Sequence, residues 1–133
     1  MKTQYAVALA IATGFGLGAA AVQGLHAQAK PPVYFITEID VSNPEAYAKE
    51  YAPKAQATIK AAGGRFLAIG GSGVSGAKVT AFDGEAPKRA VVQVWDSLEK
   101  IQAWYNSADY KEARKIGDKY ATFRSYAVEG IAP

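Results

Sequence analysis

The chemistry open to this chain is limited first by the side chains that it lacks. It has no Cys, and its single His, His26, lies in an N-terminal segment that we expect to be removed. Without imidazole or thiolate, the rest of the chain has no usual zinc or copper site, no haem held by His or Cys, no Ser-His-Asp triad and no thiol nucleophile. The sequence therefore predicts no metal and no cofactor. Carboxylates, Lys, Arg, Tyr and hydroxyl groups remain for any chemistry.

Aromatic side chains close to a few polar ones are the best candidates for a ligand site. Such groups commonly build small apolar pockets, and we predict one between a sheet and the helices that cover it. Its predicted aromatic walls are Tyr34, Trp95, Trp104 and Tyr105, and its predicted polar anchors are Glu38, Arg65 and Gln93. The strand residues among them are assigned to a face by counting alternate positions. The ligand would be a small aromatic or apolar compound. The alternative is that these rings only fill the core and a dimer interface; no catalytic residue is assigned.

Two charged patterns favour solvated surface over chemistry. Glu38 and Asp40 share one face of a predicted strand, where close carboxylates could divide acid and base roles. They stand near the end of that strand and beside a helix start, so we interpret them as surface groups. The run from Asp109 to Lys119 alternates in sign, which is typical of a solvated helix face.

Gly71, Gly73 and Gly76 spell the G-x-G-x-x-G pattern of dinucleotide-binding loops. That site requires a helix directly after the glycines, with its N-terminus at the pyrophosphate. Residues 77–89 instead contain β-branched residues, Asp83-Gly84 and Pro87, which are typical of a hairpin. We therefore predict a flexible loop here and no nucleotide site.

The first 29 residues have the pattern of a secretory signal peptide. Lys2 precedes an uncharged run from Tyr5 to Val22, and Ala27-Gln28-Ala29 provides a small-x-small cleavage site. We expect cleavage after Ala29, a periplasmic or secreted protein and no stable membrane insertion afterwards. The alternative is a retained membrane anchor, since the apolar run approaches the roughly 20 residues that span a bilayer.

Residues 30–133 are enough for one domain with one core. This segment carries 14 Lys and Arg against 12 Asp and Glu, a net charge of +2. Nucleic-acid binding depends on clustered positive charge, so the sequence predicts no nucleic-acid partner.

The order of predicted elements is that of an α+β protein. A strand at 33–41 precedes a helix that begins at Ser42-Asn43-Pro44 and ends at Gly63-Gly64, and Pro53 should kink or split this helix near Ala52. Strands follow at 65–69, 78–82 and 89–95, then a helix from Ser97 with Leu98, Ile101 and Tyr105 inward, a second helix from Ser107, and a strand at 123–129. This order predicts a ferredoxin-like βαββαβ sandwich with an extra helix, its helices on one face of an antiparallel sheet.

Such a plan leaves the second face of the sheet without a cover. Alternation assigns mostly apolar side chains to that face, namely Tyr34, Ile36, Val91, Gln93 and Trp95. Because so large an apolar surface is unusual on a monomer, we predict a homodimer in which the two sheets face each other.

Four segments resemble the family called domain of unknown function 1330. They are D-V-S-N-P-E-A-Y at 40–47, G-G-R-F-L at 63–67 with the later Gly70-Gly71, A-W-Y-N-S-A-D-Y at 103–110 and V-E-G at 128–130. The resemblance implies a dimeric α/β barrel of ferredoxin-like subunits, in a superfamily with cofactor-free monooxygenases, haem-dependent peroxidases and stress-response proteins. It implies no established activity. Relatives carry Arg where Ile69 stands and a basic residue where Gly117 stands, so no anion-binding role is carried over from those positions.

The sequence thus favours an exported, non-catalytic dimeric binding or structural module. The alternative is a cofactor-free enzyme, monooxygenase-like or isomerase-like, that acts on a small aromatic or apolar compound. A ribonucleoprotein-type RNA binder is disfavoured by export, by the modest charge and by the lack of the aromatic RNA-binding segment on the third main strand.

Overall fold

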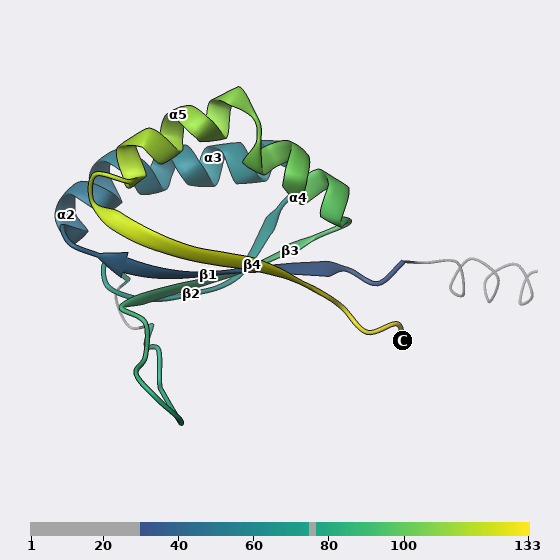
Figure 1. Ribbon diagram of the computed structural model, residues 1–133, viewed down its shortest axis with the longest axis horizontal. Helices are drawn as coiled ribbons and strands as arrows, with labels where there is room; N and C mark the ends of the chain where they lie inside the picture. The colour runs from purple at the N-terminus through teal and green to yellow at the C-terminus, as the bar shows by residue number, and fades with distance from the viewer. Residues whose placement is uncertain (1–29, 75–76) are drawn as a thin grey trace, which may run out of the picture. The chain divides into compact units, whose positions relative to one another are not determined.

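The computed structural model describes residues 30–74 and 77–133. The expected signal peptide at 1–29 lies outside the described residues, as does Gly76 of the glycine pattern. Residues Pro31–Pro133 form one unit, in which helices cover one face of a four-stranded sheet (Figure 1). The predicted α+β plan, with an extra helix before the last strand, is confirmed.

The sheet is antiparallel throughout and has the strand order β2-β3-β1-β4. Its two central strands are rich in β-branched and aromatic residues, which favour a pleated, packed surface. Two helical crossovers connect strands that are not neighbours. The strands are β1 (Val33–Val41), β2 (Arg65–Gly71), β3 (Arg89–Trp95) and β4 (Ala121–Glu129).

The first crossover is a helix in three parts, α2 (Pro44–Ala46), a π-helical turn η1 (Tyr47–Tyr51) and α3 (Ala52–Ala62). Asn43 caps its start, because its Oδ1 accepts a hydrogen bond of 3.2 Å from the Ala46 amide. Pro53 stands in the first turn of α3 and cannot donate the hydrogen bond that a continuous helix would need. The predicted change near Ala52 takes the form of a switch from π-helical to α-helical hydrogen bonding, with residues 44–62 helical throughout.

The second crossover contains α4 (Leu98–Tyr105) and α5 (Ala108–Gly117), which begin at the capping hydroxyls of Ser97 and Ser107. The prediction that Leu98 and Tyr105 point inward with Ile101 is wrong, since those two side chains are 36% and 41% exposed. Ile101 and Trp104 are buried instead. The larger Trp104 ring takes the inward position because its indole N–H can donate to Thr58 Oγ1 at 3.1 Å.

The pairing of β1 with β3 corrects the predicted face of β3. Val33, Phe35 and Thr37 stand directly opposite Trp95, Gln93 and Val91, and directly opposite residues share a face. The β3 residues Val91, Gln93 and Trp95 therefore lie under the helices, and their predicted place on the open face is wrong. Gln93 makes the buried face of β3 more polar than the open face of Ala90, Val92 and Val94, so alternation favoured the opposite face. The open face carries Tyr34, Ile36, Val92, Val94, Tyr126 and Val128.

The strand predicted at 78–82 is wrong as well. The described parts of the connection between β2 and β3, residues 72–74 and 77–88, contain no strand. In Figure 1 this connection extends away from the helices, and Phe82 is 94% exposed. Residues 77–79 lie beside Gly70 and Gly71 at the free edge of β2, where the Gly71 amide donates to the Ala77 carbonyl oxygen at 3.3 Å, but this contact does not extend into a ladder.

The core lies between the helices and the sheet and is rich in aromatic rings. Trp104 is at its centre, with ring centroids 5.5 Å from Phe35, 5.3 Å from Trp95 and 4.2 Å from Tyr110. Trp95 is 1% exposed. This face of the sheet also holds buried polar groups, which an ordinary core avoids.

Candidate functional site

A small cavity lies between the sheet and the first crossover helix. Its volume is about 40 Å³, and nine of its lining residues carry polar groups or rings that could hold a ligand: Thr37, Tyr47, Tyr51, Gln56, Phe66, Arg89, Gln93, Trp104 and Tyr110. An engineered cavity of roughly 150 Å³ binds benzene, and a water molecule occupies roughly 30 Å³ of liquid. As it stands, the cavity admits a group of a few heavy atoms and is too small for a whole aromatic ring.

Three buried polar residues, Thr37, Arg89 and Gln93, line this cavity from neighbouring strands. The Gln93 carbonyl oxygen accepts a 2.8 Å hydrogen bond from Trp95 Nε1, which leaves the Gln93 amide N–H groups for another partner. Ser125 Oγ donates to Thr37 Oγ1 at 3.2 Å. The cavity is therefore lined by hydrogen-bond donors held in place by bonds to their neighbours.

Arg89 is the most unusual of these residues. It is 5% exposed, and its guanidinium group lies 5.1 Å from the centre of the Tyr47 ring. Nη1 donates a 2.7 Å hydrogen bond to the Ser72 carbonyl oxygen, while the buried Nε has no hydrogen-bond partner. Burying an unpaired ion costs on the order of several kcal/mol, so the fold holds Arg89 at an energetic disadvantage.

The glycine-rich turn after β2 holds the backbone that Arg89 contacts. Gly71 has a φ of +97°, and a Cβ at this position would overlap the Lys88 carbonyl oxygen. The close approach lets the Ser72 amide donate to that carbonyl at 2.8 Å. No helix follows the turn within the described residues before Leu98. In this structure Gly71 of the glycine pattern shapes the turn whose Ser72 carbonyl oxygen Arg89 contacts. The pattern does not form the strand-turn-helix unit of a dinucleotide site.

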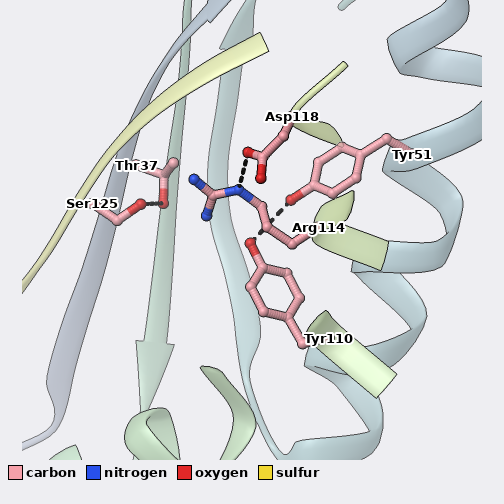
Figure 2. A network of polar contacts seen from close by, with 6 residues as sticks. All are labelled: Thr37, Tyr51, Tyr110, Arg114, Asp118 and Ser125. Atoms are coloured by element: carbon pink, nitrogen blue, oxygen red, sulfur yellow. Dashed lines mark hydrogen bonds and ion pairs between the residues drawn. The ribbon is translucent and has the colours of Figure 1, made fainter. Parts of the chain in front are cut away.

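A second polar cluster joins the helices above the cavity. Figure 2 shows the hydroxyl groups of Tyr51 and Tyr110 pointing toward each other, at an oxygen–oxygen distance of 3.1 Å. Arg114 lies beside them, with Nε donating to Asp118 Oδ1 at 2.8 Å and its guanidinium group 3.9 Å from the Phe123 ring centre. Unlike Arg89, Arg114 has a carboxylate partner.

Two tyrosines of the site, Tyr47 and Tyr51, are neutral at physiological pH. Burial raises the pKa of Tyr47 to about 12, although the nearby Arg89 lowers it. Burial and the neighbouring Tyr110 also raise the pKa of Tyr51. These hydroxyls can donate and accept hydrogen bonds, but they cannot act as bases near pH 7.

Alkaline titration should therefore weaken the fold. An unfolded Tyr ionises near pH 10 and the folded Tyr47 near pH 12, so its contribution is complete below pH 10 and is lost as the pH rises toward 12. In urea unfolding, the free energy should fall in this window by about 1.4 kcal/mol per pH unit for each Tyr held neutral. The Tyr47→Phe variant should show a decline shallower by that amount. Equal slopes in the two proteins would contradict this explanation.

The structure brings only part of the predicted pocket together. Gln93 and Trp104 line the cavity, and Trp95 packs behind them against the Trp104 ring. Tyr34, Glu38 and Arg65 belong to the opposite face of the sheet, and Tyr105 lies on the outer side of α4.

Sequence reasoning missed Arg89, Thr37, Tyr47 and Tyr51 as members of the site. Tyr47 and Tyr51 recur with Ala55 and Ile59 at helical spacing, which is the signal that could have found them. No sequence signal marked Arg89 as a site residue, because a charged residue at the start of a strand is usually exposed. Ile69, which stands where relatives carry Arg, also lines the cavity. The guanidinium group at this cavity belongs to Arg89 on the adjacent strand β3.

The other charged patterns lie at the surface. The Asp40 side chain is 67% exposed and pairs with Lys88 at 3.4 Å, and Glu38 accepts a 3.2 Å hydrogen bond from the Tyr126 hydroxyl. Across residues 30–74 and 77–133, no group of three or more His, Cys, Asp or Glu side chains could hold a metal ion. Nor is any helix in these ranges long and apolar enough to cross a membrane.

Comparison with solved structures shows the same fold in distant proteins. A protein of unknown function from Rhodopseudomonas palustris superposes with a TM-score of 0.62 at 12% identity, covering 85% of this chain and 94% of its own. SnoaB, a cofactor-independent oxygenase from Streptomyces nogalater, gives 0.55 at 12% identity, with coverages of 77% and 96%. A conserved protein of unknown function from Bacteroides thetaiotaomicron gives 0.53 at 11% identity, with coverages of 76% and 99%. At these identities the likeness establishes the fold alone.

The sequence comparisons give a family. No curated protein matches the chain. The family model described as "Domain of unknown function (DUF1330)" matches residues 32–131, which include all four strands and every described helix. With that match over most of its length, the chain belongs to the DUF1330 family.

Proposed function

We propose that this protein is an exported, dimeric binding module for a small molecule, held in the cavity between the sheet and the first crossover helix. The observation that carries the proposal is the set of buried polar side chains, Thr37, Arg89 and Gln93, beside the Trp104 ring. A helix–sheet interface that served only packing would have apolar groups there. Convergent polar groups in an otherwise apolar pocket are typical of ligand sites.

Binding without catalysis agrees with the acid–base chemistry of the lining. The residues around the cavity include Arg89 and three Tyr, with no Asp, Glu or His among them. Two of these, Tyr47 and Tyr51, have pKa values raised by burial. The cavity thus offers hydrogen bonds and one positive charge, while a general base for neutral pH is missing from its lining.

The dimer in this proposal is supported by the open face of the sheet. Tyr126 and Val128 are 39% and 46% exposed there, beside Ile36 and Val92 of the neighbouring strands. A contiguous apolar surface of this kind favours a partner, and a second copy would bring two such faces together. Export rests on the signal-peptide pattern of residues 1–29.

A thermal-shift screen of the full chain tests the binding site. Small carboxylic acids, their amides and aromatic compounds that carry either group should include some that raise the melting temperature as their concentration increases, because a ligand of the folded state stabilises by mass action. The Ala52→Val variant, whose new methyl groups reduce the cavity, should lose this shift. Ala57→Val, at an exposed position of the same helix, is the matched control and should keep it. No stabilisation by any compound would sink the proposal.

The second candidate is a cofactor-free enzyme that acts on a small aromatic or apolar compound. The same fold is found in SnoaB, a cofactor-independent oxygenase, and a buried Arg beside Trp104 could stabilise an ionised substrate. Compounds that pass the thermal screen can be incubated with the protein in aerated buffer. Oxygen uptake or a new product that disappears in Ala52→Val would establish catalysis; binding with neither would support the module.

A further inference from the structure

Arg89 is a buried cation for which the protein supplies no anion. All 12 Asp and Glu residues of the chain lie within the described residues, and none of them forms an ion pair with Arg89. Its guanidinium group donates to the Ser72 carbonyl oxygen and contacts Tyr47, and its buried Nε has no hydrogen-bond partner. Arg114, the other partly buried Arg above the cavity, is paired with Asp118. Of these two Arg residues, only the one that lines the cavity, Arg89, lacks a carboxylate partner.

The neighbouring tyrosine does not neutralise Arg89. Tyr47 lies under the guanidinium group, and its burial keeps the hydroxyl protonated at neutral pH. Its ring face attracts the cation, and this contact is weaker than an ion pair in a desolvated site. The positive charge thus remains available to a ligand.

The shape of the guanidinium group indicates what it can bind. Nε–H and one Nη2–H lie on the same edge of this planar group, and that edge faces away from Nη1, the atom used by Ser72. Two parallel donors on one edge match the two oxygens of a carboxylate. The Gln93 amide and the Thr37 hydroxyl line the same cavity and add neutral hydrogen-bonding groups.

We propose that the ligand carries a carboxylate group, which enters the cavity and pairs with Arg89. The inference rests on the proposed function, since it takes the same cavity as the binding site and names the chemistry of its ligand. The volume of about 40 Å³ suits a carboxylate of three heavy atoms, whereas the body of a larger ligand must lie outside the cavity. The Ser72 carbonyl oxygen fixes Nη1 of Arg89, and Arg89 lines the cavity.

Two acid–amide pairs test the charge requirement on the full chain. Acetate and benzoate are compared with acetamide and benzamide, which have nearly the same shape without the charge. Calorimetry at neutral pH should show each acid binding about 10-fold to 100-fold more tightly than its amide, the range expected for a charge-assisted hydrogen-bonded pair. Titration with inorganic phosphate should give weaker binding than the carboxylates, because its five heavy atoms fit a cavity of about 40 Å³ less well than the three of a carboxylate group.

Variants locate the site at Arg89. Arg89→Met should remove the preference for acid over amide, and Arg89→Lys, which keeps the charge but not the planar edge, should weaken acid binding while retaining some preference. Arg124→Met removes an equal charge from the open face of the sheet, where the Arg124 side chain is 79% exposed, and should change nothing. If Arg89→Met does not fold, the Arg89→Lys and Arg124→Met comparison still decides the question.

The outcomes separate this inference from the broader proposal. Binding of neutral aromatic compounds without a preference for acids would overturn the carboxylate inference and leave the binding module standing. Acid binding that persists unchanged in Arg89→Met and Arg89→Lys would place the anion elsewhere and also overturn it. Failure of every compound to bind would overturn both, and tighter binding of phosphate than of either acid would show that the class of anion is wrong.

Discussion

Replacing Trp95 with Ala should lower the free energy of unfolding by about 3–5 kcal/mol, the range for removing a large buried ring. Trp95 is 1% exposed, packs against Trp104 at a centroid distance of 5.3 Å, and donates its indole N–H to Gln93. Its loss leaves a cavity and strips the Gln93 carbonyl oxygen of a buried partner. Urea denaturation followed by circular dichroism measures the change.

The control for this substitution is Tyr105→Ala. Tyr105 is an aromatic residue that was also predicted to line the pocket, but it is 41% exposed. Its removal should cost less than about 1 kcal/mol, as surface substitutions do. If Trp95→Ala cannot be purified folded, Trp95→Phe should still cost more than Tyr105→Ala. Equal losses in the Trp95 and Tyr105 variants would mean that the face assigned to β3 is incorrect.

Gly71→Ala should be the second most damaging change, with a loss of about 2–5 kcal/mol. At a φ of +97° an Ala is strained by about 1–2 kcal/mol, and its Cβ would overlap the Lys88 carbonyl oxygen, a crowding that adds about 1–3 kcal/mol. The Ser72 carbonyl that holds Arg89 would move with the turn. We therefore expect both a lower unfolding midpoint in urea and weaker carboxylate binding by calorimetry.

Gly63→Ala is the matched control for Gly71→Ala. Gly63 ends α3 with a φ of +102°, and a Cβ there meets no atom within 4 Å. This variant should lose only the backbone strain of about 1–2 kcal/mol and bind carboxylates as the parent protein does. A Gly63→Ala loss equal to that of Gly71→Ala would show that the Lys88 contact has no energetic weight.

Local signals in the sequence were enough to predict most elements and their order. Asn43, Ser97 and Ser107 are capping residues whose hydrogen bonds lie within one helical turn, so neighbouring residues alone determine them. Pro53 lies at the switch from π-helical to α-helical hydrogen bonding for an equally local reason. The resemblance based on these segments agrees with the family match over residues 32–131.

Pairing between distant segments could not be predicted in the same way. The segment 78–82 has strand-like residues but forms no ladder with the edge of β2 that it approaches. In β3, Gln93 makes its face the more polar one, so alternation favoured the wrong face for Gln93 and Trp95. A shift of one residue in a strand exchanges its two faces. Of the seven residues predicted for the pocket, the structure places only Gln93 and Trp104 at the cavity.

The sequence by itself determined the α+β class, the residues at which the helices begin, the family and the absence of His and Cys from residues 30–133. These follow from composition and from contacts within a few residues. The tertiary structure alone decided that the more polar face of β3 is the buried one and that Arg89 lies in a cavity without a carboxylate. The physical reason is that a strand's face and an ion's partner depend on the register with distant strands, and no local pattern encodes that register.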